Sequence, residues 1–236
     1  MSREAVEKDL SPRKVRQSEV NKKMNVLIIY AHPNPQSFNA AMRDTAVKTL
    51  TENGHTVKVS DLYAMKFKAV LDQDDFLRRK NPDEFKPERE QLHAAKTGTF
   101  VGDIREEIEK MQWADLLLFQ FPLWWTSVPA IMKGWIDRVF APGIAFNAAE
   151  QRHYDAGLLK GKKAMLAFTA GSSKEMYSRG GVHGDITALL TYITHAIFEY
   201  VGIEALPSFV VWGAPYVPEE ERDRHLEEYR ERLRSL

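Results

Sequence analysis

The chain has 236 residues, 44% of them hydrophobic and 28% charged, which is enough apolar content for a globular core and argues against intrinsic disorder. Lysine plus arginine and aspartate plus glutamate each number 33, so the formal net charge is zero, which argues against a non-specific nucleic-acid binder. There is no cysteine, which excludes disulfide scaffolds, thiolate catalysis and cysteine-ligated metal centres, and which fits a cytoplasmic protein.

Residues 1–23 are polar and charged, and they contain no apolar stretch of the kind found in secretory signals or membrane spans. We expect them to form a flexible or helical leader. Residues 24–236 are expected to form a single domain without a membrane span.

Short apolar runs alternate with helical patterns along this domain, which is typical of a parallel sheet covered by helices. The apolar runs predict five strands, at residues 24–30, 56–60, 115–121, 163–169 and 208–212. The helical patterns predict helices at about residues 37–53, 101–113, 129–140, 186–201 and 218–236. Residues 65–100 are polar and contain Pro82 and Pro87, which predicts an irregular excursion.

Five strands in a chain of this length favour an α/β, flavodoxin-like three-layer sandwich with a parallel sheet in the order 2-1-3-4-5. In that order, a ligand crevice lies at the carboxyl ends of the first and third strands. The loops that meet there are residues 31–37, 122–128 and 170–184, and these are also the most unusual segments of the sequence.

The first loop leads from a strand into a helix, whose N-terminal N–H groups are suited to binding phosphate. Ser37 and Asn39 add a hydroxyl and an amide, and His32 adds an imidazole. The glycines of a dinucleotide fingerprint and the lysine of a P-loop are missing, which argues against a Rossmann-type nicotinamide site and against phosphoryl transfer. A capped helix whose loop binds nothing is the alternative interpretation.

The second loop is stiffened by prolines and carries Trp124 and Trp125, which could stack on a planar ligand or simply cover the sheet edge. In the third loop, Tyr177 and His183 are proton donors among several glycines. Together they could stabilise negative charge that develops on a bound ring. The spacing of the histidines argues against a metal site, and the lack of a G-x-S-x-G elbow argues against a serine hydrolase.

These loops resemble those of the NAD(P)H:quinone oxidoreductases of the DT-diaphorase type. The matching blocks lie at residues 30–39, 119–140 and 169–185, within a resemblance that covers about residues 24–214. The resemblance implies a flavodoxin-like, flavin-dependent homodimer that binds FAD, with FMN the less expected flavin. It also implies a two-step (ping-pong) reaction, in which a hydride passes from the co-substrate NAD(P)H to the flavin and then to a quinone.

The resemblance places Tyr177 and His183 beside the flavin ring as catalytic residues, and it implies no metal ligand. The remaining matched positions are expected to bind the phosphates, ring and edges of the cofactor. They are His32, Ser37, Phe38, Asn39, Lys86, Pro122, Leu123, Trp124, Trp125, Thr169, Gly171 and Ser172. Lys86 stands where some members carry a glutamine that touches the FAD diphosphate.

Two alternatives stay open at this point. Similar flavoproteins serve as ancillary subunits that regulate potassium-efflux systems, and others of the same fold are azo- or nitroreductases. The chain ends soon after its fifth strand, so we expect no counterpart of the extra C-terminal domain found in the longer animal enzymes.

Overall fold

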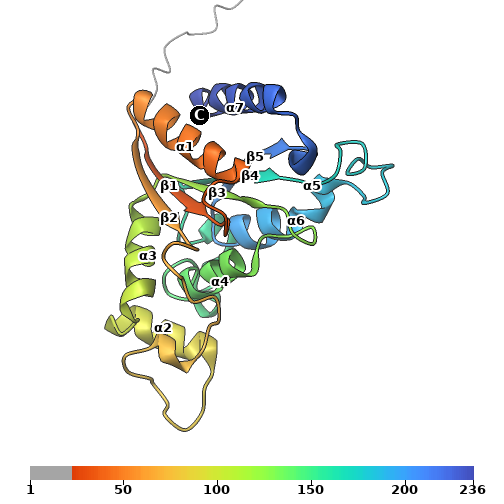
Figure 1. Ribbon diagram of the computed structural model, residues 1–236. Helices are drawn as coiled ribbons and strands as arrows, with labels where there is room; N and C mark the ends of the chain where they lie inside the picture. The colour runs from red at the N-terminus through yellow and green to blue at the C-terminus, as the bar shows by residue number, and fades with distance from the viewer. Residues whose placement is uncertain (1–22) are drawn as a thin grey trace, which may run out of the picture.

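The computed structural model of this protein describes residues 23–236. Five parallel strands form one sheet in the order β2-β1-β3-β4-β5, with helices on both faces (Figure 1). The predicted flavodoxin-like fold and strand order are therefore confirmed. The predicted leader, residues 1–23, lies outside the described residues except for Lys23.

The strands of the sheet are β1 (Asn25–Tyr30), β2 (Thr56–Asp61), β3 (Leu116–Pro122), β4 (Lys163–Thr169) and β5 (Glu204–Val211). The central strand β3 is buried along its whole length, because helices cover both of its faces. The register pairs Tyr30 of β1 with Gln120 of β3. It pairs Pro122 of β3 with Thr169 of β4, so these three strands end at the same edge of the sheet.

Two helices, α1 (Phe38–Glu52) and α7 (Glu219–Arg234), pack side by side on one face of the sheet (Figure 1). The other face carries α3 (Gly102–Trp113), α4 (Ala130–Val139), α5 (Ile186–Leu189), α6 (Thr191–Ile193) and the π-helix η4 (Thr194–Glu199). Short 3₁₀ turns are η1 (Gln73–Asp75), η2 (Ala148–Glu150), η3 (Tyr154–Ala156) and η5 (Ala214–Tyr216). No helix within residues 23–236 is long and apolar enough to cross a bilayer.

The segment between β2 and α3 projects from the body of the molecule (Figure 1). The expectation of irregular structure at residues 65–100 is wrong for its second half, where α2 (Pro87–Thr97) forms. Pro87 occupies the first position of this helix, where its missing N–H group costs nothing. Gly98 ends the helix in the left-handed conformation, with φ at 69°.

The ends of the remaining elements lie close to the predicted ones, with two exceptions. β5 begins at Glu204 rather than Ser208, because a strand at the sheet edge tolerates Pro207. The single helix predicted at residues 186–201 is instead divided into α5, α6 and η4.

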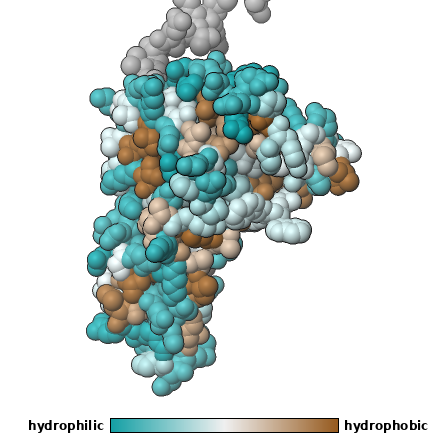
Figure 2. Space-filling model, in the orientation of Figure 1, coloured by the Kyte–Doolittle hydropathy of each residue, from teal (hydrophilic) through white to brown (hydrophobic). Residues whose placement is uncertain are grey.

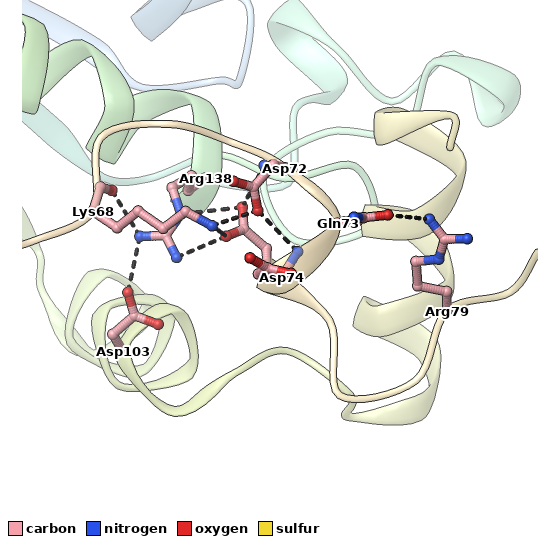
Figure 3. A network of polar contacts seen from close by, with 8 residues as sticks. Lys68, Asp72, Gln73, Asp74, Arg79, Asp103 and Arg138 are labelled. Atoms are coloured by element: carbon pink, nitrogen blue, oxygen red, sulfur yellow. Dashed lines mark hydrogen bonds and ion pairs between the residues drawn. The ribbon is translucent and has the colours of Figure 1, made fainter. Parts of the chain in front are cut away.

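A buried network of charged groups anchors the projecting segment to α3 and α4 (Figure 3). Arg138 of α4 is buried, and its Nε and Nη2 atoms donate hydrogen bonds to the Asp75 carboxylate at 3.1 and 3.0 Å. Its Nη1 atom donates to the carbonyl oxygen of Lys68 at 2.8 Å and to the carboxylate of Asp103 at 2.9 Å. The Lys68 ammonium also pairs with Asp72 and Asp75, so each strongly charged group in the network has an opposite partner.

Candidate functional site

A cavity of about 450 Å³ lies at the carboxyl ends of β1, β3 and β4, the edge where a flavodoxin-like sheet places its ligand. Its walls come from the three predicted loops, from the segment after β5 and from the start of α7. The lining residues are His32, Gln36, Ser37, Phe38, Asn39, Pro122, Leu123, Trp124, Thr169, Ala170, Gly171, Ala214, Pro215 and Arg222. Nine of the predicted cofactor-binding residues are thus brought together around one cavity.

The first turn of α1 forms one wall of the cavity. Ser37 is the N-cap of this helix, and its Oγ atom accepts a hydrogen bond from the backbone N–H of Ala40 at 3.1 Å. The Tyr30 hydroxyl lies 3.5 Å from the same Oγ atom, so the cap is supported from β1. Phe38 and Asn39 follow the cap and line the cavity, which places the positive end of the helix dipole beside it.

The His32 imidazole lies on the same side. Its Nδ1 atom lies 3.0 Å from the backbone nitrogen of Asn34 and 3.1 Å from the carbonyl oxygen of the same residue. Burial lowers the pKa of His32 below its usual value, and a contact with the Asn34 backbone opposes this only in part. At neutral pH burial therefore favours the uncharged ring, whose Nδ1 atom is in contact with the Asn34 backbone.

Asn39 brings a buried amide with one unpaired oxygen to the cavity. Its Nδ2 atom donates to the Thr169 hydroxyl at 2.8 Å, and both side chains are buried. Its Oδ1 atom is buried without a hydrogen-bond partner within residues 23–236. An unsatisfied buried acceptor costs about 1–3 kcal/mol, and a ligand that donates to it would recover this energy. The Thr169 hydroxyl can also donate, so the amide can instead turn its N–H groups toward an anionic ligand.

The second loop ends in a tight turn at the rim of the cavity. Trp124 and Ser127 exchange two backbone hydrogen bonds, each 3.0 Å long, and the two residues between them have positive φ angles of 51° and 58°. Glycine and asparagine usually fill such positions, so Trp125 and Thr126 hold a strained backbone there. Trp125 is fully exposed at the tip of the turn and does not line the cavity. The Ser127 hydroxyl hydrogen-bonds to the hydroxyl of Tyr192, which ties the turn to α6.

The third loop gathers the predicted catalytic pair next to the cavity, although neither residue lines it. The ring centroids of Tyr177 and His183 lie 4.8 Å apart, and Tyr177 also packs against Trp212. The Nε2 atom of His183 lies 3.2 Å from the Oγ atom of Ser172, directly after the lining residue Gly171. Ser172, Tyr177 and His183 therefore form one cluster beside the cavity.

Lys86 is a predicted cofactor-binding residue that is not part of this arrangement. It stands at the start of α2 on the projecting segment, where its ammonium pairs with Glu84 at 2.8 Å. It does not line the cavity, and its contact with the cofactor diphosphate stays a prediction.

The sequence analysis missed several lining residues, of which Arg222 has the clearest chemistry. It lies in the first turn of α7 and brings a permanent positive charge to the cavity. The helix predicted at residues 218–236 gave no indication of this contact, because the contact depends on how α7 packs beside α1. No group of three histidine, aspartate or glutamate side chains within residues 23–236 is arranged to hold a metal ion.

Comparison with known proteins extends the likeness to almost the whole described chain. A family model described as a flavodoxin-like fold matches residues 24–235. Ribosyldihydronicotinamide dehydrogenase (quinone) from Rattus norvegicus is 42% identical over 212 residues, which cover 89% of this chain and 91% of the relative. NAD(P)H dehydrogenase (quinone) 1 from Cavia porcellus is 40% identical over 211 residues, covering 89% of this chain and 76% of the relative.

Among solved structures, a Klebsiella pneumoniae protein named as a quinone reductase superposes with a TM-score of 0.86 at 42% identity, covering 89% of this chain and 84% of the other. The fold, the position of the cavity and these similarities agree with the resemblance inferred from the loops. The chain belongs to the flavodoxin-like family, in the group that contains the NAD(P)H:quinone dehydrogenases.

Proposed function

We propose that this protein is a flavin-dependent NAD(P)H:quinone oxidoreductase. In the overall reaction, NAD(P)H, one proton and a quinone give NAD(P)⁺ and the hydroquinone, so two electrons are transferred without a net radical product. The observation that carries the proposal is the convergence of nine matched residues, from three separate loops, on one cavity at the carboxyl ends of the strands. The membership of the family that contains the quinone dehydrogenases supports it.

We propose FAD as the flavin. The His32 imidazole, the N-terminus of α1 and the Arg222 guanidinium surround the cavity from different elements, and each can donate to a phosphate group. The unpartnered Oδ1 atom of Asn39 fits a hydroxyl donor, and the apolar Leu123 and Trp124 fit a planar ring. This donor set suits a ligand with a ring, hydroxyl groups and phosphates.

The residues of the chain have separable tasks in this reaction. A bound flavin supplies the two-electron redox chemistry, which protein side chains do not provide. The lining residues bind and orient the cofactor, while the stiff second loop holds Trp124 and the exposed Trp125 at the rim. Tyr177 and His183 stabilise negative charge by hydrogen bonding and move a proton, and the Ser172 contact orients the His183 ring.

We also propose that the protein is a homodimer. A groove of about 230 Å³ opens between α4 and η4, and its apolar lining includes Ile136, Phe140 and Ile197. The projecting segment exposes Val70 and Leu77, and Figure 2 shows apolar patches along it. Exposed apolar surface of this kind favours association. Light scattering at micromolar concentration should give twice the chain mass of 27.1 kDa, and a monomer mass would refute the dimer.

The function is tested by the cofactor and the acceptors together. The purified protein should release FAD on heating, identified by mass, and should oxidise NADH or NADPH with quinones on its own. A panel that includes azo dyes and nitroaromatic compounds separates the azo- and nitroreductase alternative. Flavin binding without turnover of any acceptor, together with co-purification of a membrane partner, would favour the regulatory-subunit alternative. We also propose that the protein is cytoplasmic. Comparison of turnover with NADH and with NADPH in the same assays gives the preferred co-substrate.

A further inference from the structure

The helix α7 reaches the cofactor cavity in two ways. Arg222 lines the cavity directly, and Tyr229 lies seven residues further along, which places it on the same face of the helix. Tyr229 is completely buried, and its ring stacks on Phe209 of β5 with centroids 4.7 Å apart. The helix α7 packs alongside α1, whose first turn lines the cavity (Figure 1).

A chain of buried hydrogen bonds leads from Tyr229 to the cavity. The Tyr229 hydroxyl lies 3.1 Å from the Oε1 atom of Gln120, in the middle of the sheet. The Nε2 atom of Gln120 donates to the carbonyl oxygen of Asn39 at 2.6 Å. Asn39 lines the cavity and continues the chain to Thr169 on the opposite wall. Four elements, α7, β3, α1 and β4, are thus joined by neutral polar groups.

The directions of the two hydrogen bonds made by the Gln120 side chain are determined by the groups themselves. A backbone carbonyl only accepts, so the Gln120 amide must turn its NH₂ group toward Asn39. Its oxygen then faces Tyr229, whose hydroxyl must donate. Burial raises the pKa of Tyr229 far above its usual value, so this hydroxyl keeps its proton at any ordinary pH.

Gln120 also connects this chain to the other side of the first loop. Its backbone oxygen accepts a hydrogen bond from the N–H of Ala31 at 3.0 Å, directly before His32. One residue of β3 therefore positions both His32 and the first turn of α1, the two groups suited to a phosphate. If its side chain loses the Tyr229 donor, a buried amide oxygen is left unpaired, and the side chain is held by the Asn39 carbonyl alone instead of at both ends.

We infer that Tyr229 is a positioning residue for the cofactor cavity, acting through Gln120 to hold Asn39 and the first turn of α1 in their binding arrangement. This rests on the proposed function only for the identity of the ligand. A phenylalanine at this position would fill the same space and stack equally well on Phe209. Packing alone therefore does not require the hydroxyl, which hydrogen-bonds to Gln120.

The test compares Tyr229→Phe, Gln120→Met and the double variant with the wild type. Two quantities are measured on flavin-free protein: the dissociation constant for FAD, from quenching of flavin fluorescence, and hydrogen exchange of the backbone amides of residues 37–41. The matched control is Tyr216→Phe, which removes the same hydroxyl from a side chain that is 82% exposed. Thermal melting of each variant reports global stability separately.

We expect Tyr229→Phe to weaken FAD binding roughly three- to tenfold, the equivalent of one lost buried hydrogen bond, and to speed exchange at residues 37–41. In the Gln120→Met background, the same substitution should add nothing, because the connection is already broken. Tyr216→Phe should leave both quantities unchanged.

Unchanged FAD affinity and exchange in Tyr229→Phe, with or without a lower melting temperature, would make this residue a packing element and overturn the inference. Equal weakening in the Gln120→Met background would also overturn it, because Tyr229 would then act by another route. If wild-type protein binds no flavin, the proposed function fails. The exchange measurement still decides the inference, since it needs no ligand.

Discussion

Two polar networks in the interior of this protein differ in whether all of their hydrogen-bonding groups have partners. The network around Arg138 is charged and closed: the guanidinium makes four hydrogen bonds, and its acceptors are carboxylates and a carbonyl from the projecting segment and α3. The network from Tyr229 through Gln120 to Asn39 is neutral and open, because the Oδ1 atom of Asn39 has no partner in the described part of the chain.

This difference distinguishes a structural network from one that can bind a ligand. The charged groups around Arg138 all have partners within the protein, and they hold the projecting segment on α3 and α4. A buried network that ends in an unpaired acceptor at a cavity leaves a position at which a ligand can donate a hydrogen bond. The two arginines follow the same division, because Arg138 is buried in the closed network whereas Arg222 is exposed at the cavity.

The largest expected effect comes from breaking the closed network. Arg138→Met should lower the free energy of unfolding by about 3–5 kcal/mol, because the buried carboxylate of Asp75 loses both hydrogen bonds from the guanidinium and keeps only its pair with Lys68. Urea unfolding measures this loss. Lys133→Ala, which breaks an exposed pair with Asp137, is the control and should cost less than about 1 kcal/mol. Equal costs in the two variants would show that the network is not the anchor.

The corresponding change at the cavity is Arg222→Met, which keeps an unbranched aliphatic side chain and removes the charge. Flavin binding should weaken about 10- to 150-fold, the range for a lost charged hydrogen bond, while the free energy of unfolding changes little because Arg222 is exposed. Titration of flavin-free protein and urea unfolding check the two halves of this prediction. A large loss of stability with unchanged flavin affinity would reverse the division between the two arginines.

The catalytic pair is tested with the cofactor in place. Tyr177→Phe and His183→Gln should slow flavin reduction by NAD(P)H roughly 5- to 150-fold, because their donors act mainly once the ring gains charge. Stopped-flow absorbance on flavin-loaded variants gives the rate. Wild-type rates with full flavin occupancy would remove both residues from the mechanism.

The smallest expected effect is a dependence of stability on pH. Burial lowers the pKa of His55 below its ordinary value of 6.5, and its Nδ1 atom accepts a hydrogen bond from the backbone N–H of Met24 at 3.1 Å. The unfolded chain therefore binds this proton more strongly, so stability is present above the unfolded pKa and falls as the pH drops below it. Urea unfolding at pH 7.5 and 5.5 should show a smaller decrease in His55→Gln than in the wild type, and equal decreases would contradict the assignment.

Much of the site could be predicted because the position of a ligand in this fold is a matter of topology. Once the strands and their order are known, the loops after β1, β3 and β4 must meet at one edge. Arg222 and Tyr229 could not be found in this way, because their places depend on how α7 packs against α1 and not on any local pattern. The helix α2 was missed for a simpler reason, since Pro87 was interpreted as a loop residue although it starts a helix.

The cofactor released from the purified protein tests the central claim most directly. Heat-released material should contain one FAD per chain by mass and absorbance, and NADH or NADPH should bleach the flavin absorbance of the intact protein until a quinone restores it. Arg222→Met prepared in parallel should retain less flavin. A colourless wild-type protein that cannot be reconstituted with FAD or FMN would contradict the assignment of the cavity to a flavin.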